Sequence, residues 1–124
     1  MRRYPSPYAS SFSFGPGPLS PALKAIIAAN VVAFLATTFV PALTSWYGLV
    51  PVAIIEQLRL WQLGSYMFLH GGIFHILFNM LALWMFGTEL ERLWGTRYFL
   101  KFYFVCGIGA GILTVLFSLL PFGF

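Results

Sequence analysis

The chain has 124 residues, of which 60% are hydrophobic and only 8% are charged, and its mean hydropathy is +0.85. Soluble domains are roughly 45–50% apolar and roughly 25% charged, so this composition excludes an ordinary soluble domain and indicates an integral membrane protein. The formal net charge is +4, but the seven Lys and Arg residues are scattered around apolar segments and form no basic patch. We therefore expect no nucleic-acid partner.

Residues 1–21 have the composition of a flexible tail, because prolines recur there among serines, glycines and tyrosines. Arg2 and Arg3 open the chain, but no apolar core follows them at the distance typical of a signal peptide. The tail is therefore expected to stay on the mature protein. We divide the chain into this tail and a membrane domain at 22–124.

The first predicted membrane helix covers residues 22–43, after the helix-start signal Ser20-Pro21. Asn30 lies in its middle, where a hydrogen bond between helices is a more common role than catalysis. Residues 44–69 mix tryptophan and tyrosine with charged and amide side chains, so this stretch is too interrupted to span. It is predicted to be a long interfacial loop with short helices, since aromatic rings with one wet edge favour the headgroup level.

The second predicted helix covers residues 71–87 and carries polar groups in an apolar stretch. His75 and Asn79 are four residues apart, so they share one helix face, and His70 precedes them. Hydrocarbon offers no water to satisfy such groups, so their face must meet protein or a wet cavity, where their donors could do chemistry.

The third predicted helix covers residues 98–120. Gly107 and Gly111 form a GxxxG motif, which favours close helix packing but is weak alone. Cys106, the single cysteine, is interpreted as a buried packing residue.

The basic residues predict the topology. Six of the seven Lys and Arg residues lie in the N-terminal flank or in the connection between helices two and three. These six are Arg2, Arg3, Lys24, Arg92, Arg97 and Lys101, against Arg59 alone in the long loop. We therefore expect a multi-pass protein with a cytoplasmic N-terminus, in the cell inner membrane if the source is bacterial.

The histidines have two simpler interpretations. Two histidines and an asparagine provide at most two good nitrogen ligands, whereas a catalytic zinc site typically has three protein ligands, so we expect no metal and no other cofactor. A histidine that only packs against its neighbours is the commoner role by residue type alone. That interpretation of His75 stays open on the residues themselves.

The run WQLGSYMFLHGGIFHILFNM at residues 61–80, followed by FGTELERLWG, resembles the second transmembrane segment and flanks of the rhomboid intramembrane serine proteases. The motifs are HGGxxHxxxNM and FGxxLExxxG, and the resemblance extends from Ala22 onward. It implies an all-α integral membrane fold, a rhomboid-like helical bundle of which this chain carries three transmembrane helices. It also implies a serine endopeptidase that cleaves transmembrane protein substrates within the lipid bilayer.

The resemblance assigns roles to individual residues. His75 and Asn79 match the pair that donates hydrogen bonds to the oxyanion formed on the scissile carbonyl, a role suited to donors fixed on one helix face. His70 matches a histidine that lines and supports the same cavity. Glu91 matches an acidic residue of the connection between the second and third helices, with a structural role.

This chain departs from the family pattern in two places. The family loop commonly carries a Trp-Arg pair, whereas this chain has Trp61-Gln62, which puts that part of the loop anchoring in doubt. The family nucleophile lies in a GxSG motif of a fourth span and the base histidine in a sixth, and neither is present before Phe124. A serine without a base is a weak nucleophile, so the chain alone is expected to be inactive.

Three explanations can account for the missing nucleophile and base. The chain is expected to be the N-terminal part of a longer protease, whose remaining spans would be its partners. The first alternative is a non-catalytic rhomboid-like protein that binds transmembrane clients, although such a binder has no need of oxyanion donors. The second is an unrelated three-span structural or transport protein.

Overall fold

The structure is a computed structural model that describes residues 15–121; residues 1–14, the larger part of the expected tail, lie outside the described part, as do residues 122–124. The described residues form helices and no strands. Three helices are long and apolar enough to cross a membrane: α2 (Pro21–Phe39), the continuous helix Ile73–Trp94, and α8 (Thr96–Ser118). The predicted all-α membrane fold with three spans is confirmed.

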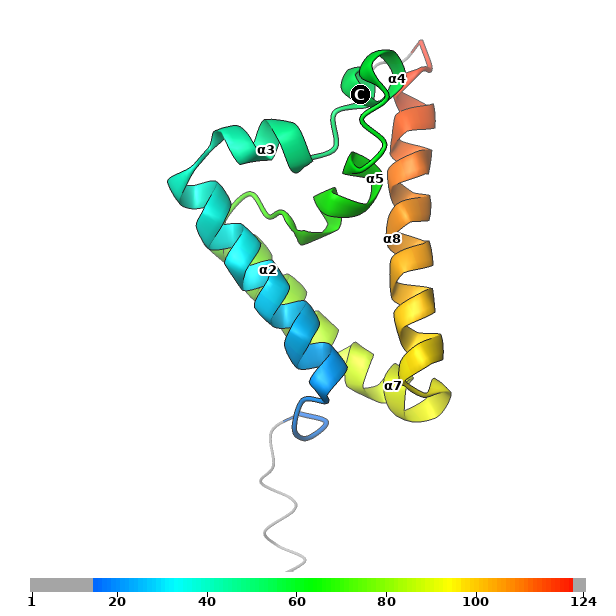
Figure 1. Ribbon diagram of the computed structural model, residues 1–124. Helices are drawn as coiled ribbons and strands as arrows, with labels where there is room; N and C mark the ends of the chain where they lie inside the picture. The colour runs from blue at the N-terminus through cyan, green and yellow to red at the C-terminus, as the bar shows by residue number, and fades with distance from the viewer. Residues whose placement is uncertain (1–14, 122–124) are drawn as a thin grey trace, which may run out of the picture.

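The first two spans lie side by side, and the third lies close to them at one end and diverges from them at the other (Figure 1). The first span, α2, contacts α6 (Ile73–Ala82), the first part of the second span. The third span contacts α7 (Thr88–Trp94) at the closed end and α5 (Gln62–Ser65) near the opposite end. The long loop between the first two spans therefore bridges α2 and α8 where these helices diverge.

A small hydrophobic core holds the closed end together. Leu23 and Ile26 of α2 pack with Phe99 of α8, and all three are buried. Gly87 of the second span faces this core, where an added Cβ would lie about 3.0 Å from the Leu23 side chain. The three spans converge here because the glycine lets the second helix come this close.

The second span is longer than the sequence predicted, and its expected end at residue 87 is wrong. The helix passes through a π-helical turn, η2 (Leu83–Gly87), and continues as α7 to Trp94. Gly87 has ordinary helical angles (φ −63°, ψ −41°), whereas Gly95 has φ +83°, which favours glycine. The helix therefore stops at Gly95, and a Glu89–Arg92 ion pair of 2.9 Å lies on its last turns.

The first span is shorter than predicted. It ends at Phe39 rather than residue 43. The reason is that Val40 precedes Pro41, and the helical backbone conformation is disfavoured for a residue before proline. A separate helix, α3 (Ala42–Tyr47), follows. The third span begins two residues earlier than predicted and ends two residues earlier, at Thr96 and Ser118.

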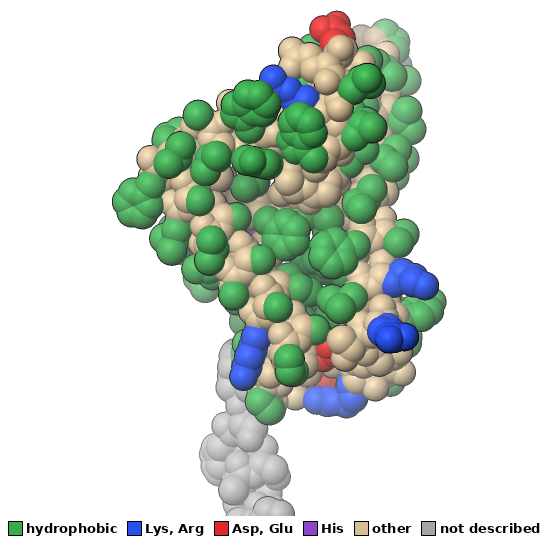
Figure 2. Space-filling model, viewed as in Figure 1, with side chains coloured by type: hydrophobic (Ala, Val, Ile, Leu, Met, Phe, Trp, Pro, Cys, Tyr) green, Lys and Arg blue, Asp and Glu red, His purple; other side chains and the backbone are tan. Residues whose placement is uncertain are grey.

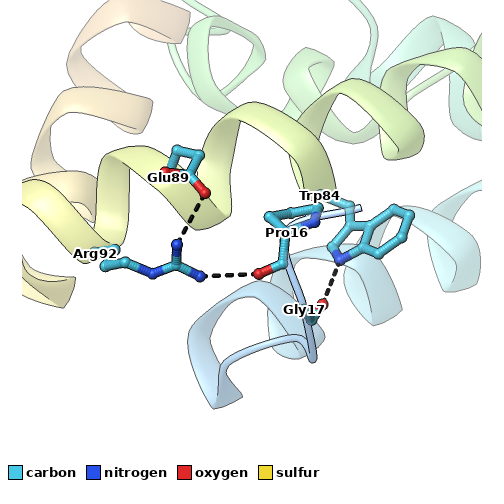
Figure 3. A network of polar contacts seen from close by, with 5 residues as sticks. All are labelled: Pro16, Gly17, Trp84, Glu89 and Arg92. Carbon is cyan, nitrogen blue, oxygen red and sulfur yellow. Dashed lines mark hydrogen bonds and ion pairs between the residues drawn. The ribbon is translucent and has the colours of Figure 1, made fainter. Parts of the chain in front are cut away.

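The end of the expected flexible tail is anchored to the second span (Figure 3). The Trp84 indole N–H donates to the Gly17 carbonyl at 2.9 Å, and the Arg92 guanidinium donates to the Pro16 carbonyl at 2.8 Å. Ser20 then caps α2 by accepting from the Leu23 N–H at 3.2 Å. The described residues before α2 thus make specific contacts with the membrane domain, while the flexibility expected of the tail stays a prediction.

The loop between the first two spans is folded, as predicted, into short helices. These are α3, α4 (Pro51–Gln57), α5 and the 3-10 turn η1 (Tyr66–Phe68). The Tyr66 hydroxyl donates to the Gly107 carbonyl of α8. A Cβ on Gly107 would overlap Met67, and one on Gly111 would lie 2.9 Å from the Tyr66 ring. In this structure the GxxxG motif therefore packs against the loop.

Asn30 is fully buried in the middle of α2. Its amide N–H donates to the Ile26 carbonyl of the same helix at 2.7 Å, and the side chain also interacts with the Tyr103 hydroxyl of α8. Both contacts are structural. Only the contact with Tyr103 lies between helices, as predicted for Asn30.

Candidate functional site

The candidate site lies at the start of the second span, near the end where the spans diverge. Gly72 precedes the first turn of α6, and His75 and Asn79 follow on one face of the helix. The Asn79 side-chain N–H donates to the His75 carbonyl at 2.8 Å, which fixes the amide along the helix. Both side chains belong to exposed residues of the chain.

A backbone contact orients the His75 ring. The Gly71 N–H donates to Nδ1 of His75, with a long N···N distance of 3.4 Å. When Nδ1 accepts a hydrogen bond, the proton of the neutral imidazole is on Nε2. His75 therefore presents an Nε2–H donor, and the second N–H of the Asn79 amide is also available to an acceptor.

His70 lies beside His75, with 5.0 Å between the ring centroids and 72° between the ring planes. Burial lowers the pKa of His70 below its ordinary value, and the charge of His75 lowers it further, while a hydrogen bond with the Phe68 backbone acts in the opposite direction. Its Nδ1 is buried, and no partner for it lies within residues 15–121. His70 thus favours the neutral form and shields one side of His75.

Two cavities flank these residues. His70 and Gly71 line a cavity of about 550 Å³ that also meets Thr37 and Thr38 near the end of α2. Asn79 lines a different cavity, of about 450 Å³, between the second and third spans. The structure brings the two histidines together and aligns His75 with Asn79, but it puts His70 and Asn79 on separate cavities.

A nucleophile is not assembled in the described part of the chain. The hydroxyls of Ser20, Ser65 and Ser118 are each hydrogen bonded to the backbone. None of the serines within residues 15–121 is hydrogen bonded to a histidine. Among the same residues, no group of three or more His, Cys, Asp or Glu side chains could hold a metal ion.

Glu91 lies in the last turn of α7. Its backbone carbonyl accepts the Gly95 N–H at 2.7 Å, which closes the helix. Its side-chain Oε2 is buried and has no hydrogen-bond partner among the described residues. The structural role expected for Glu91 stays a prediction.

Gln62 is a structural residue of the site that the sequence did not reveal. It is fully buried, and its amide N–H groups donate to the carbonyls of Ser45 and Trp46 at 3.3 and 3.1 Å. Its Oε1 accepts the Val50 N–H at 3.0 Å. These bonds tie α5 to α3 and to the start of α4, so the loop that precedes His70 is anchored by the glutamine.

Arg59 and Trp61 add to this anchor. The guanidinium of Arg59 lies 4.2 Å from the centroid of the Trp46 ring, a cation–π contact. The Trp61 ring stacks on Trp46 with 6.5 Å between centroids, and its indole N–H donates to the Trp46 carbonyl at 2.8 Å. The Trp61-Gln62 sequence therefore supports the loop without an arginine at position 62.

Comparison with known proteins agrees with this architecture of apolar helices and a paired His–Asn face. The Rhomboid domain family model matches residues 57–122, more than half of the chain. The chain belongs to the rhomboid family.

Several named rhomboid proteins are similar to the chain. The rhomboid protease GluP of Bacillus subtilis is 42% identical over 69 residues, which cover 56% of this chain and 14% of that protein. RHOMBOID-like protein 2 of Arabidopsis thaliana is 39% identical over 52% of this chain and 20% of its own length. The rhomboid protease GlpG of Yersinia pestis is 32% identical over 86% of this chain and 38% of its own length.

The chain thus spans well under half the length of the relatives that it matches. No solved structure matches it significantly. Family membership and three membrane-spanning helices establish a multi-pass membrane protein of the rhomboid class.

Proposed function

We propose that this chain provides the oxyanion-stabilising part of an intramembrane serine endopeptidase that cleaves transmembrane substrates. The observation that carries the proposal is the alignment of His75 and Asn79 on one face of α6, with Asn79 bonded to the His75 backbone at 2.8 Å. Fixed donors in a low-dielectric site stabilise negative charge that develops on a carbonyl oxygen without having to reorient. His70 supports the ring of His75 from the side.

The nucleophile and the base are proposed to come from polypeptide outside these 124 residues. None of the eight serines lies in a GxSG motif, and the only two histidines already belong to the oxyanion region. Three of the described serine hydroxyls are bonded to backbone atoms. By itself, the chain is therefore expected to lack proteolytic activity, since a serine nucleophile requires a neighbouring base.

The test compares the purified chain with a fusion to rhomboid spans that carry the GxSG serine and the base histidine. A fluorophosphonate probe and a transmembrane substrate report on the two preparations. We expect no labelling and no cleavage by the chain alone, and both in the fusion. Labelling of a serine in the isolated chain that is lost in His75→Ala would contradict the proposal, as would a fusion that cleaves equally well without His75 and Asn79.

We also propose that the N-terminus is cytoplasmic, as the distribution of Lys and Arg indicates. Gln57 at the end of α4 and Leu93 in α7 lie at opposite ends of the molecule (Figure 1). In a Cys106→Ala background, a membrane-impermeant thiol reagent added outside cells should modify Gln57→Cys and spare Leu93→Cys. The reverse pattern would overturn this orientation.

A further inference from the structure

The outer face of the first turns of α8 combines a groove with unpaired positive charge. Tyr98, Lys101, Phe102 and Val105 line a cavity of about 210 Å³. Their spacing puts them on one helix face, to the side of Phe99, which is buried in the core. We call this surface, together with Arg97, the α8 basic groove.

The cations of the groove have no partner in the described part of the chain. The ion pair found there joins Arg92 to Glu89, and neither Arg97 nor Lys101 lies in a salt bridge or a side-chain hydrogen bond. The first turn of α8 contains no acidic residue. A cation in the first turn of a helix is opposed by the helix dipole, so Arg97 does not stabilise α8.

Aromatic side chains place the groove at a membrane surface. The Trp94 ring packs edge-on against Tyr98 and Phe102, with centroid distances of 5.4 and 5.0 Å. Tryptophan and tyrosine favour the level of the lipid headgroups, where one edge of the ring is wet. Figure 2 shows Lys and Arg side chains gathered on the end of the molecule where α7 and α8 meet.

We propose that the α8 basic groove binds one anionic phospholipid. Arg97 and Lys101 would contact the phosphate and the anionic headgroup, since guanidinium and ammonium groups bind phosphate oxygens through charge-assisted hydrogen bonds. An acyl chain of the same lipid would lie along Tyr98, Phe102 and Val105, which follow one face of the helix into the apolar part of the span. Charge complementarity selects an anionic headgroup over a zwitterionic one.

A purely topological role for the same charges predicts something different. Basic residues that only orient the spans during insertion would attract anionic lipid diffusely, in proportion to its fraction in the bilayer. A groove with two cations and an apolar floor predicts a saturable site for a single lipid. Saturation and stoichiometry therefore separate the two roles.

Native mass spectrometry of the purified 124-residue chain tests the proposal. The delipidated protein is titrated with phosphatidylglycerol and, separately, with phosphatidylcholine of the same acyl chains. The variants are Arg97→Gln/Lys101→Gln and the matched control Arg59→Gln, which removes a cation at the other end of the molecule. Circular dichroism checks that each variant keeps its helix content.

The wild type and Arg59→Gln are expected to bind one phosphatidylglycerol in preference to phosphatidylcholine. Arg97→Gln/Lys101→Gln should lose this preference by roughly 5- to 30-fold in apparent affinity, the effect of removing two charges beside an anionic headgroup. Equal affinity of the wild type for both lipids, non-saturating binding, or an equal loss in the control would overturn the proposal. If the double variant loses helix content, the single variants Arg97→Lys and Lys101→Arg should each keep the preference, and its loss there would count against the site.

Discussion

Gln62 and Asn79 are both side-chain amides in a largely apolar chain, but the structure uses them in opposite ways. Gln62 is fully buried, and its three hydrogen bonds reach the backbone of Ser45, Trp46 and Val50. Asn79 is exposed and makes one hydrogen bond, to the carbonyl of His75 in its own helix. An amide whose groups are all bonded holds the fold, whereas an oriented amide with a spare donor is available to a substrate.

The same contrast holds for the rings nearby. Trp61 and Arg59 both meet Trp46, through a stack, a hydrogen bond and a cation–π contact. His75 instead has one long hydrogen bond from the Gly71 N–H, and an edge contact with His70. Rigid structural contacts in the loop thus lie next to donors that are oriented and still free. The proposed oxyanion role needs such an arrangement, because a fixed framework keeps free donors in place.

The largest expected effect is on turnover. In the fusion that carries a nucleophile and a base, Asn79→Ala should lower the cleavage rate of a transmembrane substrate by about 10² to 10³, or about 3 kcal/mol, the cost of one oxyanion donor. The thermal stability of the Asn79→Ala variant should change little, because Asn79 is exposed and bonds only to its own helix.

The matched variant at the structural amide is Gln62→Leu. This variant should change mainly the stability of the protein, whereas Asn79→Ala should change mainly the cleavage rate. A wild-type cleavage rate in Asn79→Ala would show that the exposed amide has no part in oxyanion stabilisation.

The second effect is on stability. Gln62→Leu leaves the Ser45 carbonyl and the Val50 N–H without a partner, whereas the Trp46 carbonyl keeps the hydrogen bond from the Trp61 indole N–H. Each buried polar group left unpaired costs about 1–3 kcal/mol, so we expect at least about 2 kcal/mol of destabilisation, measured by SDS titration in detergent micelles.

The control for this variant is Gln57→Leu, an exposed position at the end of α4. It should leave the unfolding midpoint nearly unchanged. Equal stability of the two leucine variants would refute the anchoring role of Gln62.

The sequence predicted the number and type of the spans because composition and length alone determine them. It also predicted the shared face of His75 and Asn79, which follows from their spacing on any helix. Helix ends were less predictable. The first span stops before Pro41, as local chemistry requires, but the second passes through Gly87, because this glycine packs against Leu23 and Phe99 instead of ending the helix.

Gln62 could not have been predicted as an anchor. In the sequence it looks like Gln57, and only the tertiary fold shows that one is buried and the other exposed. Likewise, Pro16 and Gly17 resemble a mobile segment until the fold brings Trp84 and Arg92 beside them. Contacts between residues far apart in the sequence decide both cases, and no local pattern encodes them.

A third, smaller effect concerns this anchored segment at the closed end of the molecule. Trp84→Phe removes the indole N–H that donates to the Gly17 carbonyl but keeps a ring at the position. We expect a loss of about 1 kcal/mol in unfolding free energy, typical of one hydrogen bond. Trp94→Phe is the control, since the Trp94 contacts are between rings and survive the change. An effect of Trp94→Phe as large as that of Trp84→Phe would show that the indole–Gly17 bond contributes nothing specific.

The smallest expected effect is a pH dependence at the open end, from His70. Burial and the charge of His75 lower the pKa of His70 in the folded state below the ordinary value of 6.5. As the pH falls below this value, the unfolded chain takes up a proton that folded His70 still resists, so the unfolded state binds more protons and stability decreases. Above about pH 6.5 neither state binds this proton, and the full stability is present.

SDS titrations between about pH 7.5 and about pH 5.5, the range in which histidines titrate, measure this effect. The wild type should lose stability as the pH falls, and His70→Gln should lose less of it, because it removes the group that is hard to protonate in the folded protein. His75→Gln should have an intermediate pH dependence, since it removes only the neighbouring charge and leaves the burial of His70. An identical pH dependence in wild type and His70→Gln would show that His70 is as easily protonated in the folded protein as in the unfolded chain. It would also contradict the idea that His70 supports the ring of His75 while His70 itself is neutral.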